Sequence, residues 1–135
     1  MLVLRSGVDL LEIERLQRSM QRYGDRLLER VFTPRELAEV GDNPASLAAR
    51  FAAKEAVSKA LGTGIGAVTW KEIEVLRGPA GQPVLFLHGK AQQLAQELDL
   101  CTWSISLSHS QTQAIAMVVA AGSVADQAGG TSPPE

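Results

Sequence analysis

The sequence contains a single cysteine, Cys101, among its 135 residues. One thiol excludes an internal disulfide framework and any thiolate metal cluster. Because Cys101 follows the apolar Leu100, we expect a thiol in or near the core, with no redox role implied.

A strong charge imbalance and a long apolar run are also missing. The formal net charge of −2 argues against a general nucleic-acid or membrane-surface binder. No apolar run approaches the roughly 18 residues that a membrane span requires. The segment from Met1 to Arg5 is too short and wrongly flanked for a signal peptide. The sequence therefore predicts a cytoplasmic protein that binds neither nucleic acid nor a membrane.

The length and a hydrophobic content of 45% predict one domain, which we place at residues 1–121. Residues 122–135 are rich in Gly, Ser and Pro and are expected to form a disordered tail. The hydrophobic periodicity predicts an α+β fold in which helices cover one face of a mostly antiparallel sheet. A small sheet of this kind has edges that must be covered or paired, which favours oligomerisation.

The periodicity also places the individual elements. In the first strand Gly7 is an expected interruption, and Gly24 is an expected break in the first helix. The segment Thr33-Pro34-Arg35-Glu36 is typical of a helix N-terminus. Strands are expected over residues 3–11, 70–76, 84–87, 102–108 and 114–120, and helices over residues 13–27, 34–40, 46–61 and 89–98.

The helix over residues 46–61 is the centre of the chain, with Ser46 as the expected N-cap and Gly62 as the expected stop. Its apolar positions form two faces, so we expect it to be largely enclosed. Glu55 and Lys59 emerge together near its C-terminal end. Judged from the helix alone, they are an ordinary i,i+4 ion pair followed by a glycine C-cap.

The rest of the chain adds charged residues that change this interpretation. Asp9, Glu55, Lys59, the glycine-rich loop 62–66 and His109 all fall at the ends of predicted elements, where side chains can converge. Two carboxylates without clustered His or Cys favour a hard cation such as Mg²⁺, which completes its shell with water and phosphate oxygens. The pattern therefore predicts a phosphorylated ligand. Lys59 and the amides of the loop would neutralise the rest of its negative charge. The structural alternatives are a helix N-cap at Asp9 and a surface histidine at His109.

A stripe of basic residues runs along one side of the helix predicted over residues 13–27. It consists of Arg15, Arg18, Arg22 and Arg26. Such a stripe is usually a solvated face, but four arginines without an acidic residue among them favour an acidic partner.

Four motifs occur in a fixed order between residues 3 and 120. They are Gly7-Val8-Asp9-Leu10 with Glu12-Ile13 and Arg15; Arg30-Val31-Phe32-Thr33; Arg50-Phe51-Ala52-Ala53-Lys54-Glu55-Ala56 with Lys59-Ala60-Leu61-Gly62-Thr63-Gly64; and Ile105-Ser106-Leu107-Ser108-His109. Together they resemble the holo-acyl-carrier-protein synthase family of phosphopantetheinyl transferases. The resemblance implies transfer of 4′-phosphopantetheine from coenzyme A to a serine of an apo acyl carrier protein, with release of adenosine 3′,5′-bisphosphate.

The resemblance also implies roles for individual residues. Asp9 and Glu55 would hold Mg²⁺ on the coenzyme A pyrophosphate, and Lys59 would lie near the phosphates. Either Glu55 or a metal-bound water would take the proton of the carrier serine. The neighbourhood of the coenzyme would include Arg50, Gly62, Thr63, Gly64 and His109.

The resemblance further implies partners. Short members of the family form homotrimers with the sites between subunits, in agreement with the expected sheet edges. Acyl carrier proteins are strongly acidic, so the arginine stripe becomes the expected docking surface. Whether the carrier serves fatty-acid or polyketide synthesis stays open.

Two other functions share part of this pattern. A non-catalytic module that binds a carrier or a nucleotide needs no metal carboxylates, and a turnover assay with coenzyme A separates it from a transferase. A magnesium-dependent pyrophosphate hydrolase needs no arginine stripe, and it would release pantetheine phosphate without a carrier.

Overall fold

The computed structural model describes residues 1–125 as an α+β fold built around one long helix. A three-stranded antiparallel sheet has the order β1-β5-β4, and a separate antiparallel hairpin joins two further strands. The strands are β1 (Leu2–Glu12), β2 (Ile73–Arg77), β3 (Pro83–Leu87), β4 (Thr102–His109) and β5 (Gln113–Ser123). The predicted fold class, helices against mostly antiparallel sheet, is confirmed.

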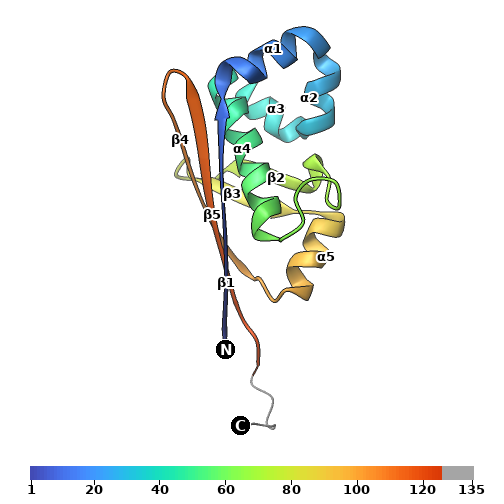
Figure 1. Ribbon diagram of the computed structural model, residues 1–135, viewed down its shortest axis with the longest axis vertical. Coiled ribbons are helices and arrows are strands. Elements are labelled where there is room, and N and C mark those ends of the chain that lie inside the picture. Colours follow the sequence, from blue (N-terminus) through green and yellow to red (C-terminus); the bar gives the residue numbers. More distant parts are fainter. Residues whose placement is uncertain (126–135) are drawn as a thin grey trace.

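The helices occupy two places relative to the strands (Figure 1). The central helix α4 lies along the sheet, and three short helices gather at one end of the molecule. The helices are α1 (Ile13–Tyr23), α2 (Asp25–Val31), α3 (Pro34–Val40), α4 (Pro44–Ala60) and α5 (Gly89–Glu97), with a 3₁₀ turn η1 (Trp70–Glu72). No helix among residues 1–125 is long and apolar enough to cross a bilayer.

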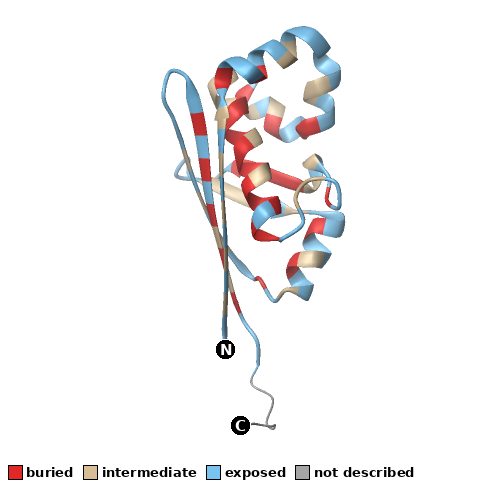
Figure 2. Ribbon diagram, in the orientation of Figure 1, coloured by how far each residue is buried: buried red, intermediate tan, exposed pale blue. Residues whose placement is uncertain are grey.

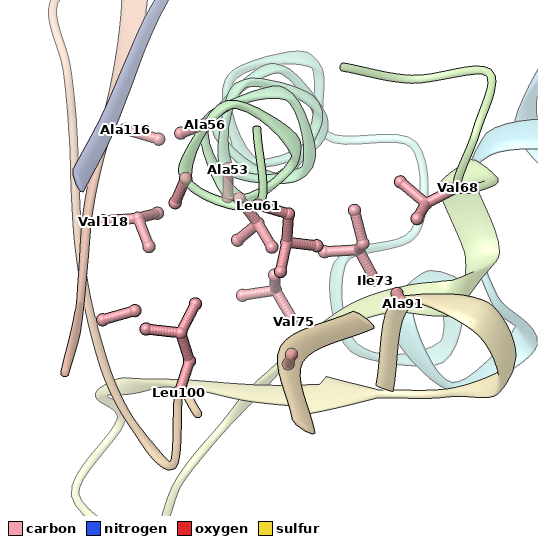
Figure 3. Close-up of a cluster of buried hydrophobic side chains, with 14 of the residues drawn as sticks. Ala53, Ala56, Leu61, Val68, Ile73, Val75, Ala91, Leu100, Ala116 and Val118 are labelled. Atoms are coloured by element: carbon pink, nitrogen blue, oxygen red, sulfur yellow. The ribbon is translucent and has the colours of Figure 1, made fainter. Parts of the chain in front are cut away.

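The core explains why α4 is central. The buried cluster includes Ala53 and Ala56 of α4 and its C-cap residue Leu61. These side chains pack together with Val118 of the sheet and Val75 of the β2–β3 hairpin (Figure 3). Small alanines let the sheet and the hairpin approach α4 closely from two sides. The expectation of a largely enclosed helix is confirmed, because most of α4 is buried (Figure 2).

Gly7 does not interrupt β1, contrary to the expectation. The strand runs through it, and a Cβ at this position would collide with the carbonyl oxygen of Ala56 in α4. Glycine is therefore required at residue 7 by the close approach of helix and strand rather than by a break in the strand.

Several other local predictions differ from the structure. The N-cap of α4 is Asn43, whose side chain accepts a hydrogen bond from the amide of Ser46, so Ser46 is not the cap. The segment expected as a strand from residue 70 begins instead with the turn η1. Cys101 is exposed rather than in the core. The strand β5 continues to Ser123, so residues 122 and 123 belong to the sheet and not to the expected tail, and residues 126–135 of that expected tail lie outside the described part of the chain.

The sheet has two different faces. Residues of β5 alternate between buried and exposed, with Ala114, Ala116 and Val118 turned toward α4. The opposite face has no helix over it among residues 1–125 and exposes apolar side chains of paired strands. These are Leu2, Leu4, Val8 and Leu10 on β1 and Ile115 and Met117 on β5.

Candidate active site

Asp9 and Lys59 meet where β1 passes the C-terminal half of α4. The Lys59 ammonium donates hydrogen bonds to Asp9 Oδ1 at 3.1 Å and to the Val8 carbonyl oxygen at 2.9 Å. The Asp9 side chain is 20% exposed and the Lys59 side chain 51%. Asp9 is not a helix N-cap, because Glu12 occupies that position at the start of α1.

Glu55 lies one turn before Lys59 on α4 and is partly buried. Within residues 1–125 its carboxylate has no hydrogen-bond partner, so Lys59 bonds to Asp9 and not to Glu55. Burial and the nearby charge of Asp9 raise the pKa of Glu55, and Lys59 opposes that rise. The two carboxylates thus lie close enough to repel each other. Lys59 bonds to Asp9 and also lowers the pKa of Glu55 through its charge.

The two carboxylates open into a cleft of about 370 Å³. Arg15 and Ser19 of α1, Leu27 of α2 and Phe51 of α4 also line it. The cleft is therefore bounded by acidic groups at β1 and α4 and by a cation at α1, a distribution that suits a charged ligand.

The donor set fits Mg²⁺. No third His, Cys, Asp or Glu joins the two carboxylates to form a metal cluster in the described chain. Mg²⁺ commonly uses one or two carboxylates and takes its other ligands from water and substrate phosphates. A cation between Asp9 and Glu55 would also relieve the repulsion that raises the pKa of Glu55.

The glycine-rich loop is arranged differently from the expectation that its amides neutralise phosphate charge. The Gly62 amide donates to the Lys59 carbonyl, and the amides of Thr63 and Gly64 both donate to the Ser58 carbonyl. These bonds satisfy the last carbonyls of α4, as in a helix C-cap. In this conformation the amides of residues 62–64 are therefore not available to bind a phosphate.

Arg50 and His109 are not brought to the Asp9 cluster. The buried Arg50 side chain donates to the Val75 carbonyl oxygen at 3.2 Å and to Glu39 at 3.2 Å, and burial lowers the pKa of its guanidinium. His109 is exposed at the end of β4 and lines a second cleft with Asn43 and Pro44. The two clefts share no lining residue.

The arginine stripe divides at Gly24, where α1 ends and α2 begins, as expected for this glycine. Arg15 lines the cleft of Asp9 and Glu55, whereas Arg22 and Arg26 line a separate groove around Tyr23. All four arginines are exposed.

Two details of the stripe were not foreseen. Arg18 forms an ion pair with Glu14 at 2.9 Å, so the stripe does have an acidic neighbour. Arg30 joins Arg22 and Arg26 at the groove. The spacing of four residues from Arg26 to Arg30 was a signal for this addition.

A buried charged network on the other side of α4 was missed by the sequence analysis. Lys54 and Glu36 are both completely buried and form an ion pair at 2.8 Å. Lys54 also donates to the carbonyls of Trp70 and Ile73, and Glu36 accepts from the Val75 amide. Because burial lowers the pKa of Lys54 and Glu36 opposes this, the pair depends on both members.

The buried network also holds Lys54, the residue before Glu55, in one position. Glu36 also forms the capping box of α3 with Thr33, as the Thr33-Pro34-Arg35-Glu36 segment predicts. The ion pair therefore ties α3, α4 and the β2 edge together. A lysine among the buried alanines 52, 53 and 56 was the signal that could have revealed it.

Comparison with known proteins identifies the family of the chain. The family model of the 4′-phosphopantetheinyl transferase superfamily matches residues 5–118. The chain is 50% identical to a holo-[acyl-carrier-protein] synthase of Herpetosiphon aurantiacus over 127 residues, which cover 89% of this chain and 100% of the relative. It is 48% identical to the Moorella thermoacetica synthase over 128 residues, with 93% and 99% coverage.

A solved structure agrees with these relatives. The crystal structure of the Helicobacter pylori holo-[acyl-carrier-protein] synthase in complex with coenzyme A superimposes with a TM-score of 0.79 at 33% identity. The match covers 85% of this chain and 98% of that protein. The chain therefore belongs to the holo-acyl-carrier-protein synthase family of phosphopantetheinyl transferases and is an enzyme.

Proposed function

We propose that the protein transfers 4′-phosphopantetheine from coenzyme A to a serine of an apo acyl carrier protein in a magnesium-dependent reaction that releases adenosine 3′,5′-bisphosphate. The observation that carries the proposal is the convergence of Asp9 and Glu55 at one cleft beside Arg15, with Lys59 hydrogen-bonded to Asp9. Support also comes from the Helicobacter pylori relative, which binds coenzyme A.

Asp9 and Glu55 are the residues that would hold Mg²⁺ against the coenzyme A pyrophosphate. The ion, when bound, neutralises negative charge on the phosphates during transfer. Lys59 is hydrogen-bonded to Asp9 and would supply a second cation for the leaving bisphosphate. Phosphoryl transfer depends mainly on such positioning and charge stabilisation.

Glu55, or a water molecule on the Mg²⁺ that Asp9 and Glu55 would hold, is the candidate base of the reaction. The serine hydroxyl must lose its proton as its oxygen attacks the phosphorus on the pantetheine side. Of the two carboxylates, Asp9 is occupied by Lys59, whereas Glu55 has a raised pKa and no hydrogen-bond partner within the described chain.

The proposed coenzyme site extends from this cluster to residues 62–64 of the same chain, and His109 would be contributed by a neighbouring subunit. Gly62, Thr63 and Gly64 follow directly after Lys59 and lie at the end of α4. Arg50 was also expected near the coenzyme, but Glu39 and Val75 occupy its guanidinium. We therefore assign Arg50 to holding α4 against β2, a positioning role.

We propose further that the protein is a homotrimer whose subunits meet through the outer face of the sheet. Exposed apolar residues of β1 and β5 support this, since Leu4, Val8, Leu10 and Met117 are each more than half exposed in the single chain. Contiguous apolar patches of this kind mark protein interfaces. Because one chain places His109 on a separate cleft, His109 would act at the site of a neighbouring subunit.

Exposed arginines are the proposed docking surface for the carrier. Arg15 lines the cleft, Arg22 and Arg26 line the groove, and Arg18 is exposed on α1 between them, so an acidic carrier that binds here would bring its serine toward Glu55. Charge complementarity of this type raises the rate of association more than the final affinity. A cytoplasmic location remains a prediction of the composition.

The test of the function is product analysis by mass spectrometry. The protein is incubated with coenzyme A, Mg²⁺ and apo carriers of fatty-acid and polyketide synthesis. We expect one carrier serine to gain phosphopantetheine and adenosine 3′,5′-bisphosphate to appear in equal amount. Release of pantetheine phosphate without a carrier would indicate a hydrolase instead, and coenzyme binding without any product would indicate a non-catalytic module.

The shared site has its own test. Asp9→Asn and His109→Ala chains are each purified, then mixed under conditions that exchange subunits. If His109 serves a neighbouring subunit, mixed trimers contain some intact sites and regain part of the lost activity. Activity that stays at the level of the separate variants, with subunit exchange demonstrated by mass, would contradict the shared site.

A further inference from the structure

Trp70 is an aromatic residue that none of the roles above uses. It begins the turn η1 between α4 and β2 and is partly buried. Its ring lies against the ring of Phe51 in α4, with the two ring centroids 4.6 Å apart and the two planes tilted by 35°. Phe51 lines the cleft of Asp9 and Glu55, whereas Trp70 is not among the residues that line it. The Trp70 ring therefore supports a cleft residue from behind.

Phe51 lies where its ring can touch a substrate at Glu55. It precedes Glu55 by one turn of α4, so the two side chains share one face of the helix. Leu16 of α1 and Leu27 of α2 line the same cleft. Phe51 thus belongs to the apolar wall near α1 and α2, the two helices that carry the proposed docking arginines. A carrier serine that enters from these helices passes the Phe51 ring on its way to Glu55.

The turn that carries Trp70 is attached to α4. The buried ammonium of Lys54 donates to the Trp70 carbonyl oxygen at 3.0 Å and also to the carbonyl oxygen of Ile73, three residues later. The Thr69 amide donates to the Glu72 side chain at 2.7 Å within the turn. The turn is therefore held at its start and at its end, so the fold fixes where the Trp70 ring lies.

The simplest explanation of Trp70 is a core residue that fills space between α2, α4 and η1, because it packs against the cluster around Leu16 and Val31. Its indole N–H makes no hydrogen bond within residues 1–125, although a buried tryptophan usually finds a partner for this group. The position therefore uses the ring and not the polar atom. What distinguishes Trp70 from an ordinary core residue is that the ring it supports, Phe51, lines the cleft.

We propose that Trp70 is a positioning residue of the transfer reaction, whose ring holds Phe51 where the cleft aligns the carrier serine with Glu55 and the coenzyme phosphorus. The assignment rests on the proposed function, because it requires the carrier serine to enter this cleft. Trp70 itself touches no substrate in this role. Reacting groups must be aligned closely, so a small displacement of the cleft wall lowers the rate steeply.

The test is a double-mutant cycle in the full-length protein. Steady-state kinetics with an apo carrier are measured for the wild type, Trp70→Leu, Phe51→Leu and the double variant. Trp70→Leu should lower kcat/KM for the carrier by about tenfold. If Trp70 acts through Phe51, the double variant should be no slower than Phe51→Leu alone. The affinity for coenzyme A in the presence of Mg²⁺, measured by titration calorimetry, should stay unchanged, because Asp9 and Glu55 keep their places.

Two further variants separate positioning from stability. Trp70→Phe keeps an aromatic ring behind Phe51 and should retain most of the activity. Trp103→Leu is the matched control, because Trp103 is a partly buried tryptophan that packs against the other core cluster and does not line the cleft. It should lower the thermal midpoint, as Trp70→Leu does, and leave kcat/KM for the carrier unchanged. The kinetics of each variant are measured well below its thermal midpoint, so that unfolding does not enter the rate.

The outcomes are distinguishable. A wild type that forms no product from coenzyme A with any carrier overturns the proposed function, and the assignment fails with it. If the wild type is active and Trp70→Leu loses only stability, Trp70 is a core residue and the assignment alone is wrong. A double variant slower than Phe51→Leu by the full factor of Trp70→Leu would also overturn it, because Trp70 would then act independently of Phe51.

A second substitution keeps the test decisive if Trp70→Leu does not fold. Trp70→Met fills more of the space without supplying a ring, and it then takes the place of Trp70→Leu in the cycle. The same loss of kcat/KM and the same lack of additivity with Phe51→Leu are expected for it, and full activity of Trp70→Met would contradict the assignment.

Discussion

Lys54 and Glu55 are adjacent in the chain and lie in opposite environments. Lys54 is completely buried, paired with Glu36 and hydrogen-bonded to two backbone carbonyls. Glu55 opens into a cleft and has no hydrogen-bond partner in the described chain. About 100° of helix rotation separates neighbouring residues, so one side of α4 carries a structural ion pair and the next carries the proposed chemistry. Because Lys54 is buried with all these partners, its substitution should lower the free energy of unfolding. The Glu55 carboxylate, in contrast, is available to bind a ligand.

The largest effect should come from the open side of α4. We expect Asp9→Asn and Glu55→Gln each to lower turnover by a factor on the order of 100 or more, since each removes an anionic metal ligand. Stability should be unchanged or slightly higher in Glu55→Gln, because one of two repelling carboxylates is gone, whereas Asp9→Asn also loses its ion pair with Lys59. Steady-state kinetics over a range of Mg²⁺ and urea unfolding measure the two effects.

The matched control for these variants is Glu97→Gln, an exposed carboxylate on α5. It should change neither turnover nor stability. Near wild-type turnover of either site variant at low Mg²⁺ would contradict the metal assignment.

The second-largest effect should be a loss of stability from a substitution in the buried Lys54–Glu36 pair. Lys54→Met leaves the Glu36 carboxylate buried without its partner, and we expect a loss of about 3–5 kcal/mol in the free energy of unfolding. The double variant with Glu36→Gln should recover part of that loss. Urea titration measures both. A loss below about 1 kcal/mol for the single variant would mean that the pair is not a structural requirement.

A second buried carboxylate, Glu74, should produce a smaller, pH-dependent effect. Burial opposes its ionisation, but hydrogen bonds from Arg35, Thr33 and His88 outweigh burial and lower the pKa of Glu74 to about 2. A lowered pKa stabilises the fold above the ordinary value of 4.5, and this stability is lost as pH falls from there toward 2. We expect a loss on the order of 1–2 kcal/mol, because Arg35 is 61% exposed and solvent screens its charge.

Unfolding measured between pH 6 and pH 2 tests this expectation against Glu74→Gln, which cannot titrate. The acid-dependent loss should be smaller in the variant than in the wild type. Equal losses in both proteins would show that other groups cause the acid sensitivity.

The smallest effect should come from the arginines outside the cleft. Arg18→Glu with Arg22→Glu replaces attraction to an acidic carrier by repulsion, and we expect the KM for the carrier to rise by about tenfold. Coenzyme A binding should stay unchanged. The wild-type rate at limiting carrier should fall as salt is raised, because the Debye length shrinks from about 10 Å at 0.1 M to about 3 Å at 1 M.

Turnover against carrier concentration measures the change in KM. The pair between Arg18 and Glu14 suggests a matched comparison, in which Arg22→Glu alone should have a larger effect than Arg18→Glu alone. An unchanged KM in the double variant would leave the stripe as a solvated surface.

Much of the fold was predictable from the sequence because the patterns are local. The alternation in residues 102–108 identified β4, and the cap residues identified α3. The prediction at Gly7 was wrong, because a glycine that ends a strand and a glycine that admits a helix look alike in sequence. Trp70 to Glu72 formed a 3₁₀ turn where a strand was expected, since the capping box at Thr69 was stronger than the β propensity of its neighbours.

The sequence by itself determined which residues could carry the chemistry, because charged residues among alanines and glycines at element ends are visible without coordinates. It placed Asp9, Glu55 and Lys59 in one group, and tertiary structure added that Lys59 bonds to Asp9 and leaves Glu55 free. Only tertiary structure decided that Lys54 is structural, that the amides of residues 62–64 close the helix, and that the Trp70 ring packs behind Phe51 of the cleft. The physical reason is that periodicity assigns a residue to a face of its own element, while a hydrogen-bond partner is chosen by how two distant elements pack.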